Sequence, residues 1–188
     1  MNDNGALMDK IKILTETYDS DHKKAVFFKK SQKMDRAEMV SQNIQLNDLL
    51  EHTVYTMPNT NKIFIDYLYF KTYAYPDIYD KVADRLIVIL DEIKLSYGNY
   101  EIFVNLDSIT ISALERHKNL IKIFYDICIK NNLTYSKFLT KCVFYNVPNM
   151  IDTIKVVLFP FLMPNVRNII EFYNKTQTDY IMNSVKHS

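Results

Sequence analysis

The sequence predicts an α/β fold, in which a mixed sheet is flanked by helices and preceded by an N-terminal helical extension. From residue 62 onward, short runs rich in Ile, Val, Phe and Tyr alternate with longer segments whose apolar residues recur at helical spacing. This alternation is typical of strands joined by right-handed helical crossovers. We therefore expect a helical extension over residues 1–56 and a domain over residues 57–188 with about four to six strands.

The N-terminal extension is predicted to contain helices at residues 5–17 and 21–51. Leu7, Ile11 and Leu14 recur at helical spacing, and a second apolar cluster lies between Ile44 and Leu50.

A basic stretch, residues 23–36, surrounds the aromatic pair Phe27 and Phe28. Two interpretations remain open for it. The stretch is either a solvated helix face with one aromatic anchor, or a surface that docks on a membrane or on a partner. In the second interpretation, Lys29, Lys30 and Lys33 contact the membrane surface.

The next segment is predicted to form a turn, a strand and a helix in that order. Residues 57–61 are a turn-like break, and residues 62–70 alternate in part and are rich in Ile, Tyr and Phe, which favours a strand. Pro76 stands near the first turn of a helix, and Gly98 ends this helix in the manner of a C-terminal cap. The apolar face of the helix consists of Ile78, Val82, Leu86, Ile89 and Ile93.

Shorter apolar runs indicate the remaining elements. Residues 100–106, 141–145 and 169–173 are predicted strands, and helices are predicted over residues 112–131 and 149–162. The tail from residue 176 is predicted to be helical but weakly held.

Composition argues against two classes of function. The 188-residue chain has only two glycines, Gly5 and Gly98, whereas phosphate-binding loops need glycines where the backbone approaches a ligand closely. P-loop and Rossmann-type nucleotide binding are therefore not expected. A net charge of +1 argues against a broad surface for nucleic acid.

No sequence pattern points to catalysis or to a metal. The four histidines show no metal-ligand spacing with one another or with Cys128 and Cys142, which we interpret as buried thiols in a reducing compartment. The scattered carboxylates accompany no nucleophile elbow and no HExxH motif. We therefore expect a protein that is not an enzyme.

The sequence also predicts where the protein resides. The N-terminal residues show no apolar signal core behind a basic start, and the apolar run at residues 156–163 is too short to span a bilayer. A cytoplasmic location is expected.

Three segments resemble the motifs of one family. Residues 104–112 (VNLDSITIS) are similar to a strand and turn with a hydrophobic-Asp-Leu-x-Gly-hydrophobic-Ser pattern, and residues 141–148 (KCVFYNVP) to a strand that ends in Asn-Ala-Pro. Residues 160–164 (PFLMP) are similar to a Lys-Pro-Phe-Leu-Asp-Pro element that closes the following helix. On these segments, the chain resembles the CRAL-TRIO family of lipid-binding proteins, which includes phosphatidylinositol/phosphatidylcholine transfer proteins. The resemblance extends over residues 62–175.

The resemblance implies a lipid pocket that is covered by a mobile gate helix, residues 149–162. This segment is apolar over a wide arc, and Pro148 and Pro160 bracket it. An ordinary core helix is the alternative interpretation. The implied gate and pocket residues are Phe144, Met150, Ile151, Ile154, Val157, Leu158 and Phe161.

The chain also departs from the family pattern, and two functional hypotheses follow. Asn105 and Ser108 stand where the family has Asp and Gly, and Phe159 stands where it has Lys. The first hypothesis is binding and transfer of a phospholipid or another hydrophobic small molecule, with transient contact to a membrane surface and no cofactor other than a bound lipid. The second is a protein-interaction scaffold that keeps the fold but fills its pocket with aromatic side chains.

Overall fold

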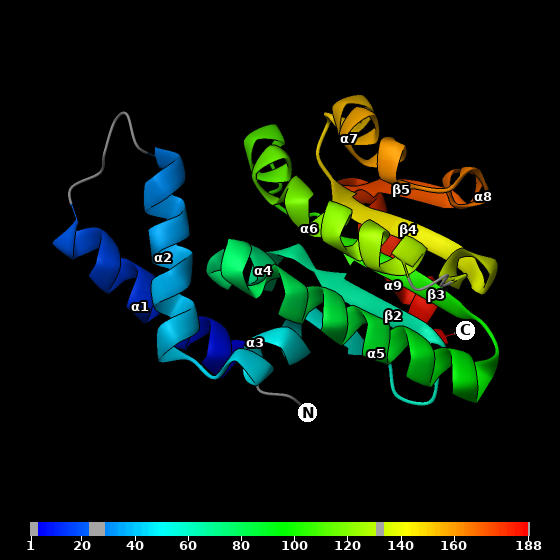
Figure 1. Ribbon diagram of the computed structural model, residues 1–188, viewed down its shortest axis with the longest axis horizontal. Coiled ribbons are helices and arrows are strands. Elements are labelled where there is room, and N and C mark those ends of the chain that lie inside the picture. The colour runs from blue at the N-terminus through cyan, green and yellow to red at the C-terminus, as the bar shows by residue number, and fades with distance from the viewer. Residues whose placement is uncertain (1–3, 23–28, 131–133, 188) are drawn as a thin grey trace.

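The computed structural model describes residues 4–22, 29–130 and 134–187. Within these ranges, five strands form one mixed sheet whose order follows the chain (Figure 1). β1 is antiparallel to β2, and every later pair of neighbours is parallel. The predicted α/β fold, a mixed sheet flanked by helices, is confirmed. The strands are β1 (Val54–Thr56), β2 (Lys62–Asp66), β3 (Tyr100–Asn105), β4 (Leu139–Val147) and β5 (Ile170–Asn174).

Helices connect the parallel strands. Because each of these strands lies beside its predecessor, right-handed crossovers bring the connecting helices to one face of the sheet. Figure 1 shows α5, α6 and α7 following one another across the strands. The β2–β3 connection contains α4 (Tyr67–Tyr73), η1 (Pro76–Ile78) and α5 (Tyr79–Tyr97). The β3–β4 connection contains α6 (Ile111–Lys130) and η2 (Tyr135–Lys137). The β4–β5 connection contains α7 (Ile151–Leu158), η3 (Phe159–Phe161) and α8 (Pro164–Asn168).

The face of the sheet under the crossover helices is apolar. Ile65, Val104, Phe144 and Phe172 stand at matching register positions and form one row across four strands. The rings of Phe144 and Phe172 stack with their centroids 5.2 Å apart. Since successive residues of a strand point to opposite faces, this row is the base on which the crossover helices pack.

The opposite face is covered by the C-terminal helix α9 (Lys175–His187). Phe64 and Phe103 stack in the neighbouring row of the sheet, and Ile181 and Val185 of α9 are buried in the same cluster. The tail is therefore packed, in contrast to the predicted weakly held helix. The difference arises because Ile181 and Val185 lie one turn apart and meet an apolar sheet face that belongs to distant parts of the chain.

The N-terminal part consists of α1 (Asn4–Asp21), α2 (Lys29–Asn43) and α3 (Leu46–Thr53). The helix predicted over residues 21–51 is divided, because Gln45 leaves the helical conformation with φ −57° and ψ 123°. β1 follows α3 directly and pairs with β2 across the predicted turn at residues 57–61. The predicted boundary at residue 56 thus falls inside a β-hairpin.

The strand predicted over residues 62–70 ends early, at Asp66. Its carboxylate Oδ1 accepts a hydrogen bond from the backbone N–H of Leu68 at 2.8 Å and so caps α4. The aromatic residues that favour a strand in the sequence are buried from a helix instead: Tyr67, Tyr69 and Phe70.

The remaining elements follow the prediction closely. Gly98 ends α5 with φ 75°, a left-handed conformation that suits glycine, and its N–H bonds to the Lys94 carbonyl at 2.9 Å. The strands at residues 100–106, 141–145 and 169–173 are confirmed, as is the helix at residues 112–131 up to residue 130, beyond which residue 131 lies outside the described ranges. The helix at residues 149–162 is α7 followed by the 3₁₀ turn η3, where Pro160 has no N–H to continue the α-helical pattern.

Candidate ligand-binding cavity

An apolar cavity of about 280 Å³ lies between the sheet and the crossover helices. Its base consists of Val54, Ile65, Val104 and Phe144, one from each of the strands β1 to β4. Three of these side chains belong to the apolar row described above, so the register of the parallel strands positions the base of the cavity.

Helices α4, α5 and α6 form the walls of the cavity. Lining residues of α6 recur at spacings of three and four, which places them on one face of the helix. Ala83 and Ala113 are the smallest side chains of the walls and leave space that larger residues would fill. The wall residues are Tyr67, Phe70, Val82, Ala83, Leu86, Ala113, Leu114, His117, Leu120, Ile121 and Phe124.

α7 and the residues after it border the cavity on another side. Ile154, Leu158 and Leu162 line the cavity, and each lies four residues from the next. Ile154 is 1% exposed, whereas Val156 is 73% exposed. One face of α7 therefore belongs to the cavity and another faces solvent.

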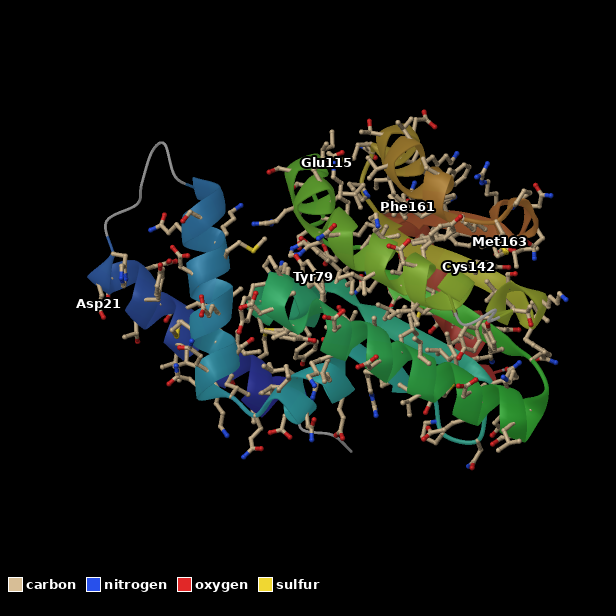
Figure 2. The ribbon with its side chains drawn as sticks, viewed as in Figure 1. Asp21, Tyr79, Glu115, Cys142, Phe161 and Met163 are labelled. Atoms are coloured by element: carbon tan, nitrogen blue, oxygen red, sulfur yellow. The ribbon has the colours of Figure 1, made fainter. Side chains whose placement is uncertain are left out.

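The structure brings together only some of the predicted pocket residues. Phe144, Ile154 and Leu158 line the cavity. Met150, Ile151 and Val157 pack half-buried against the surrounding core but do not line the cavity. Phe161, labelled in Figure 2, does not line the cavity. Its ring instead packs against Tyr125 of α6, with the ring centroids 6.3 Å apart.

Sequence reasoning missed the walls of the cavity. The apolar faces of α5 and α6 have the periodicity of ordinary core helices, and nothing in that periodicity separates a packed face from one that borders a void. The small residues Ala83 and Ala113 were the available signal. Leu162 belongs to the predicted gate segment but not to the predicted site residues.

Thr53 is a polar residue of the cavity wall whose hydrogen-bonding groups are already used. Its hydroxyl accepts a hydrogen bond from the Tyr73 hydroxyl at 2.8 Å and donates one to the Leu49 carbonyl at 2.9 Å. Because its hydroxyl is already hydrogen-bonded, Thr53 can line the cavity without a polar ligand group as a partner.

A second polar contact joins Tyr79, labelled at the start of α5 in Figure 2, to His117 of α6. The Tyr79 hydroxyl lies 2.7 Å from Nδ1 of His117. Burial lowers the pKa of His117 to about 3, with a smaller contribution from the charge of Arg116, and burial raises the pKa of Tyr79 to about 12. Both side chains are therefore uncharged at neutral pH.

A separate polar pocket of about 360 Å³ lies at the carboxyl edge of the parallel strands, and Asn146, Asp107 and Lys175 are among its lining residues. Asn146 Nδ2 donates to Asn105 Oδ1 at 3.0 Å, and Asn105 Nδ2 donates to Asp66 Oδ1 at 3.2 Å. Lys175 Nζ lies 3.5 Å from a carboxylate oxygen of Asp107. These side chains hold the strand ends to one another, which is a structural role.

The lysines predicted to contact a membrane belong to α2. Lys33 is exposed, whereas the side chains of Lys29 and Lys30 and all of residues 23–28, including Phe27 and Phe28, lie outside the described part of the structure. Figure 1 shows α2 beside α4, at the end of the molecule away from α7. The structure therefore does not bring Lys33 to the cavity.

The arrangement and protonation of the ionisable groups bear on metal binding and on nucleophilic chemistry. Across residues 4–22, 29–130 and 134–187, no three His, Cys, Asp or Glu side chains are arranged to hold a metal ion. Cys128 and Cys142 are free, and burial raises the thiol pKa to about 11 for Cys128 and about 12 for Cys142. Both thiols are therefore protonated at neutral pH, whereas a nucleophilic cysteine needs its thiolate.

Comparison with protein-family models and with curated proteins found no match for the chain. None of the helices in the described ranges is long and apolar enough to cross a membrane. The cavity and its lining are the features from which a function is inferred.

Proposed function

We propose that this protein binds a hydrophobic ligand in the cavity beneath α7 and exchanges it with a membrane, without catalysing a reaction. The observation that supports this proposal is the cavity itself, about 280 Å³ of space lined almost wholly by apolar side chains. Protein interiors are normally close-packed, with few voids larger than a water molecule. Apolar space of this size is typical of a site for a small apolar molecule.

The volume of the cavity limits the size of the ligand. Ligand pockets commonly occupy about 300–1,000 Å³, and an apolar cavity of about 150 Å³ holds one benzene molecule. A cavity of about 280 Å³ therefore takes a single chain or ring system on the order of ten carbon atoms. Of the predicted partners, a hydrophobic small molecule is favoured over a two-chain phospholipid, because the second chain would fit only if α7 moved away from the cavity.

We further propose that α7 is the gate of the cavity. Each buried methylene stabilises the bound ligand by about 0.8 kcal/mol, so release of a ten-carbon chain into water costs roughly 8 kcal/mol and exchange through water is slow. Exchange at a membrane avoids this cost, because the chain passes from one apolar environment to another. Val156 on α7 and Met163 after η3 are exposed and provide apolar contacts for such a surface.

The resemblance to CRAL-TRIO proteins supports the same proposal. In that resemblance, residues 149–162 are the gate helix, and this segment supplies Ile154, Leu158 and Leu162 to the cavity. A cytoplasmic location with transient peripheral contact to membranes belongs to the proposal. The alternative hypothesis, a scaffold with a filled pocket, is less well supported, because the aromatic side chains around the cavity leave it open.

Two measurements test the proposal. Organic extraction and mass spectrometry of the purified protein should detect an apolar molecule with a single chain or ring system. Binding of n-decane, delivered from cyclodextrin and measured by displacement of a fluorescent hydrophobic probe, tests the cavity whatever co-purifies. If no lipid is extracted and n-decane does not bind, the proposal is wrong and the scaffold hypothesis gains support.

A further inference from the structure

One polar side chain at the cavity keeps a nitrogen without a hydrogen-bond partner. His117 lines the cavity and is 8% exposed, and its Nδ1 is occupied by the Tyr79 hydroxyl at 2.7 Å. Within the described part of the chain, no residue forms a hydrogen bond with its Nε2. Phe70 packs edge-on against the imidazole, with ring centroids 4.9 Å apart and an interplanar angle of 67°. The ring is thus held in one orientation by Phe70 and Tyr79.

The contact with Tyr79 determines which ring nitrogen carries the proton. The Tyr79 hydroxyl is buried, and the described residues offer it His117 Nδ1 as its hydrogen-bond partner. A proton on Nδ1 would be donated to the hydroxyl oxygen and would leave the buried hydroxyl proton without an acceptor, which is costly. The favoured arrangement has Tyr79 donating to Nδ1 and the single proton of the neutral imidazole on Nε2.

We infer that the Nε2–H of His117 donates a hydrogen bond to the ligand, and that the ligand carries an uncharged acceptor oxygen, such as that of a ketone, ester or alcohol. This inference rests on the proposed function and specifies the class of ligand. Leu114 and Ile121 flank His117 on the cavity side of α6 and carry no donor. Tyr67 also lines the cavity, but its hydroxyl interacts with Arg116. One acceptor is therefore satisfied, whereas a carboxylate would keep most of its charge without solvation. His117 becomes a residue that determines specificity.

Comparison of n-decane with 2-decanone isolates this hydrogen bond, because the two probes differ by one acceptor oxygen on the same chain. Both are measured by probe displacement on the full chain and on His117→Phe, which removes the donor and keeps a ring in place. Comparing the ratio of the two dissociation constants between proteins cancels differences in the hydration of the probes. We expect the relative affinity for 2-decanone to fall about three- to tenfold in His117→Phe, as for the loss of one neutral hydrogen bond.

Leu120→Val is the matched control, because Leu120 lines the same cavity from the same helix and carries no polar atom. It should weaken the binding of n-decane and of 2-decanone to a similar extent and leave the ratio of their dissociation constants unchanged. If His117→Phe binds both probes with the wild-type ratio, the role of His117 is overturned and the proposed function stands. If neither probe binds the wild-type chain, the proposed function itself fails, and the inference fails with it.

The tautomer can be tested on the unaltered chain, so the result does not depend on the folding of a variant. Two-bond ¹H–¹⁵N correlation spectra distinguish protonated from unprotonated ring nitrogens. We expect Nε2 of His117 to be protonated and Nδ1 unprotonated at neutral pH, and the Nε2 resonance to shift on addition of 2-decanone more than on addition of n-decane. A proton on Nδ1, or equal shifts with the two probes, would overturn the inference.

Discussion

At the scale of single residues, burial determines the charge of the groups around the cavity. Nothing in the sequence distinguishes His117 from the other histidines, yet the fold places it between Phe70 and Tyr79, where burial lowers its pKa to about 3. Burial likewise raises the pKa of Tyr79, whose hydroxyl contacts His117, to about 12. Uncharged groups at this boundary are compatible with an apolar ligand, because they add no desolvation cost of a charge.

The lowered pKa of His117 predicts that stability decreases in mild acid. The unfolded chain takes up a proton near the ordinary histidine pKa of about 6.5, whereas folded His117 stays neutral down to a pKa of about 3. This contribution to stability is therefore fully present above about pH 6.5 and is lost as the pH falls toward about 3. Between about pH 7 and pH 5, the free energy of unfolding should fall by about 2 kcal/mol from this group.

Urea denaturation of the wild type and of His117→Phe at both pH values measures the effect. The variant lacks the titrating group, so its loss of stability over the same interval should be smaller by that amount. An equal loss in the two proteins would show that His117 does not keep its neutral form in the folded state.

At the scale of elements, α7 has one face that lines the cavity and another that is exposed to solvent. Ile154 and Leu158 face the cavity, and Val156 faces solvent beside the exposed carboxylate of Asp152, which pairs with Lys155 at 3.7 Å. The inner face of α7 thus packs against the core, and the outer face is the one through which the proposed gate would contact a membrane. A charge should have opposite consequences on these two faces.

Val156→Asp tests the outer face of α7. Because Val156 is 73% exposed, the new carboxylate stays hydrated and the free energy of unfolding should change by no more than about 0.5 kcal/mol. Transfer of 2-decanone to phosphatidylcholine vesicles should slow several-fold if this face contacts the membrane. Ile154→Asp is the matched control on the inner face, and it should lose several kcal/mol of stability by burying a charge. Unchanged transfer by a folded Val156→Asp would contradict membrane contact through α7.

The basic stretch that includes the start of α2 allows a second test of membrane contact. If Lys29, Lys30 and Lys33 steer the protein to anionic membranes, each contributes about 1 kcal/mol, and binding weakens as salt rises. Their joint replacement by Glu should abolish co-sedimentation with anionic vesicles at low salt. Thermal unfolding should change little, since Lys33 is exposed. Unchanged co-sedimentation would leave α2 as a structural extension and assign any membrane contact to another surface.

At the scale of the whole molecule, the order in which the chain forms its strands and helices creates the cavity. The parallel strands follow one another in order, so α5, α6 and α7 succeed one another over the same face, and the cavity lies where α6 meets its neighbours above the row that contains Val104 and Phe144. α9 covers the other face of the sheet. The N-terminal helices share the main core, with Val40 and Leu49 buried in it.

Filling the cavity should abolish binding without loss of stability. Ala113→Leu adds three carbon atoms at a buried wall position that borders empty space, so the free energy of unfolding should be unchanged or increased while the affinity for n-decane falls at least tenfold. Ala37→Leu is the matched control, because Ala37 is equally buried in α2 but does not line the cavity. This control should lose about 1–3 kcal/mol by overpacking and keep its affinity. Equal destabilisation of the two variants would mean that the cavity is not open space.

The elements of this fold could largely be predicted from the sequence. Helical spacing from Ile78 to Ile93, the cap at Gly98 and the apolar run at residues 141–145 each depend on neighbours within one segment, and each is found where it is predicted. Phe144, Ile154 and Leu158 of the cavity could also be predicted from short segments, because the family resemblance depends on consecutive residues.

The cavity between those elements depends instead on contacts between distant parts of the chain. The aromatic run after Asp66 becomes a helix because that carboxylate caps it, and α9 is held because it meets the stacked rings of Phe64 and Phe103. The cavity is the space left over where side chains from β1 to β4, α4, α5, α6 and α7 meet, and it remains open partly because Ala83 and Ala113 are small. Such a space depends on the summed volumes of residues that are far apart in the chain, so no single segment encodes it.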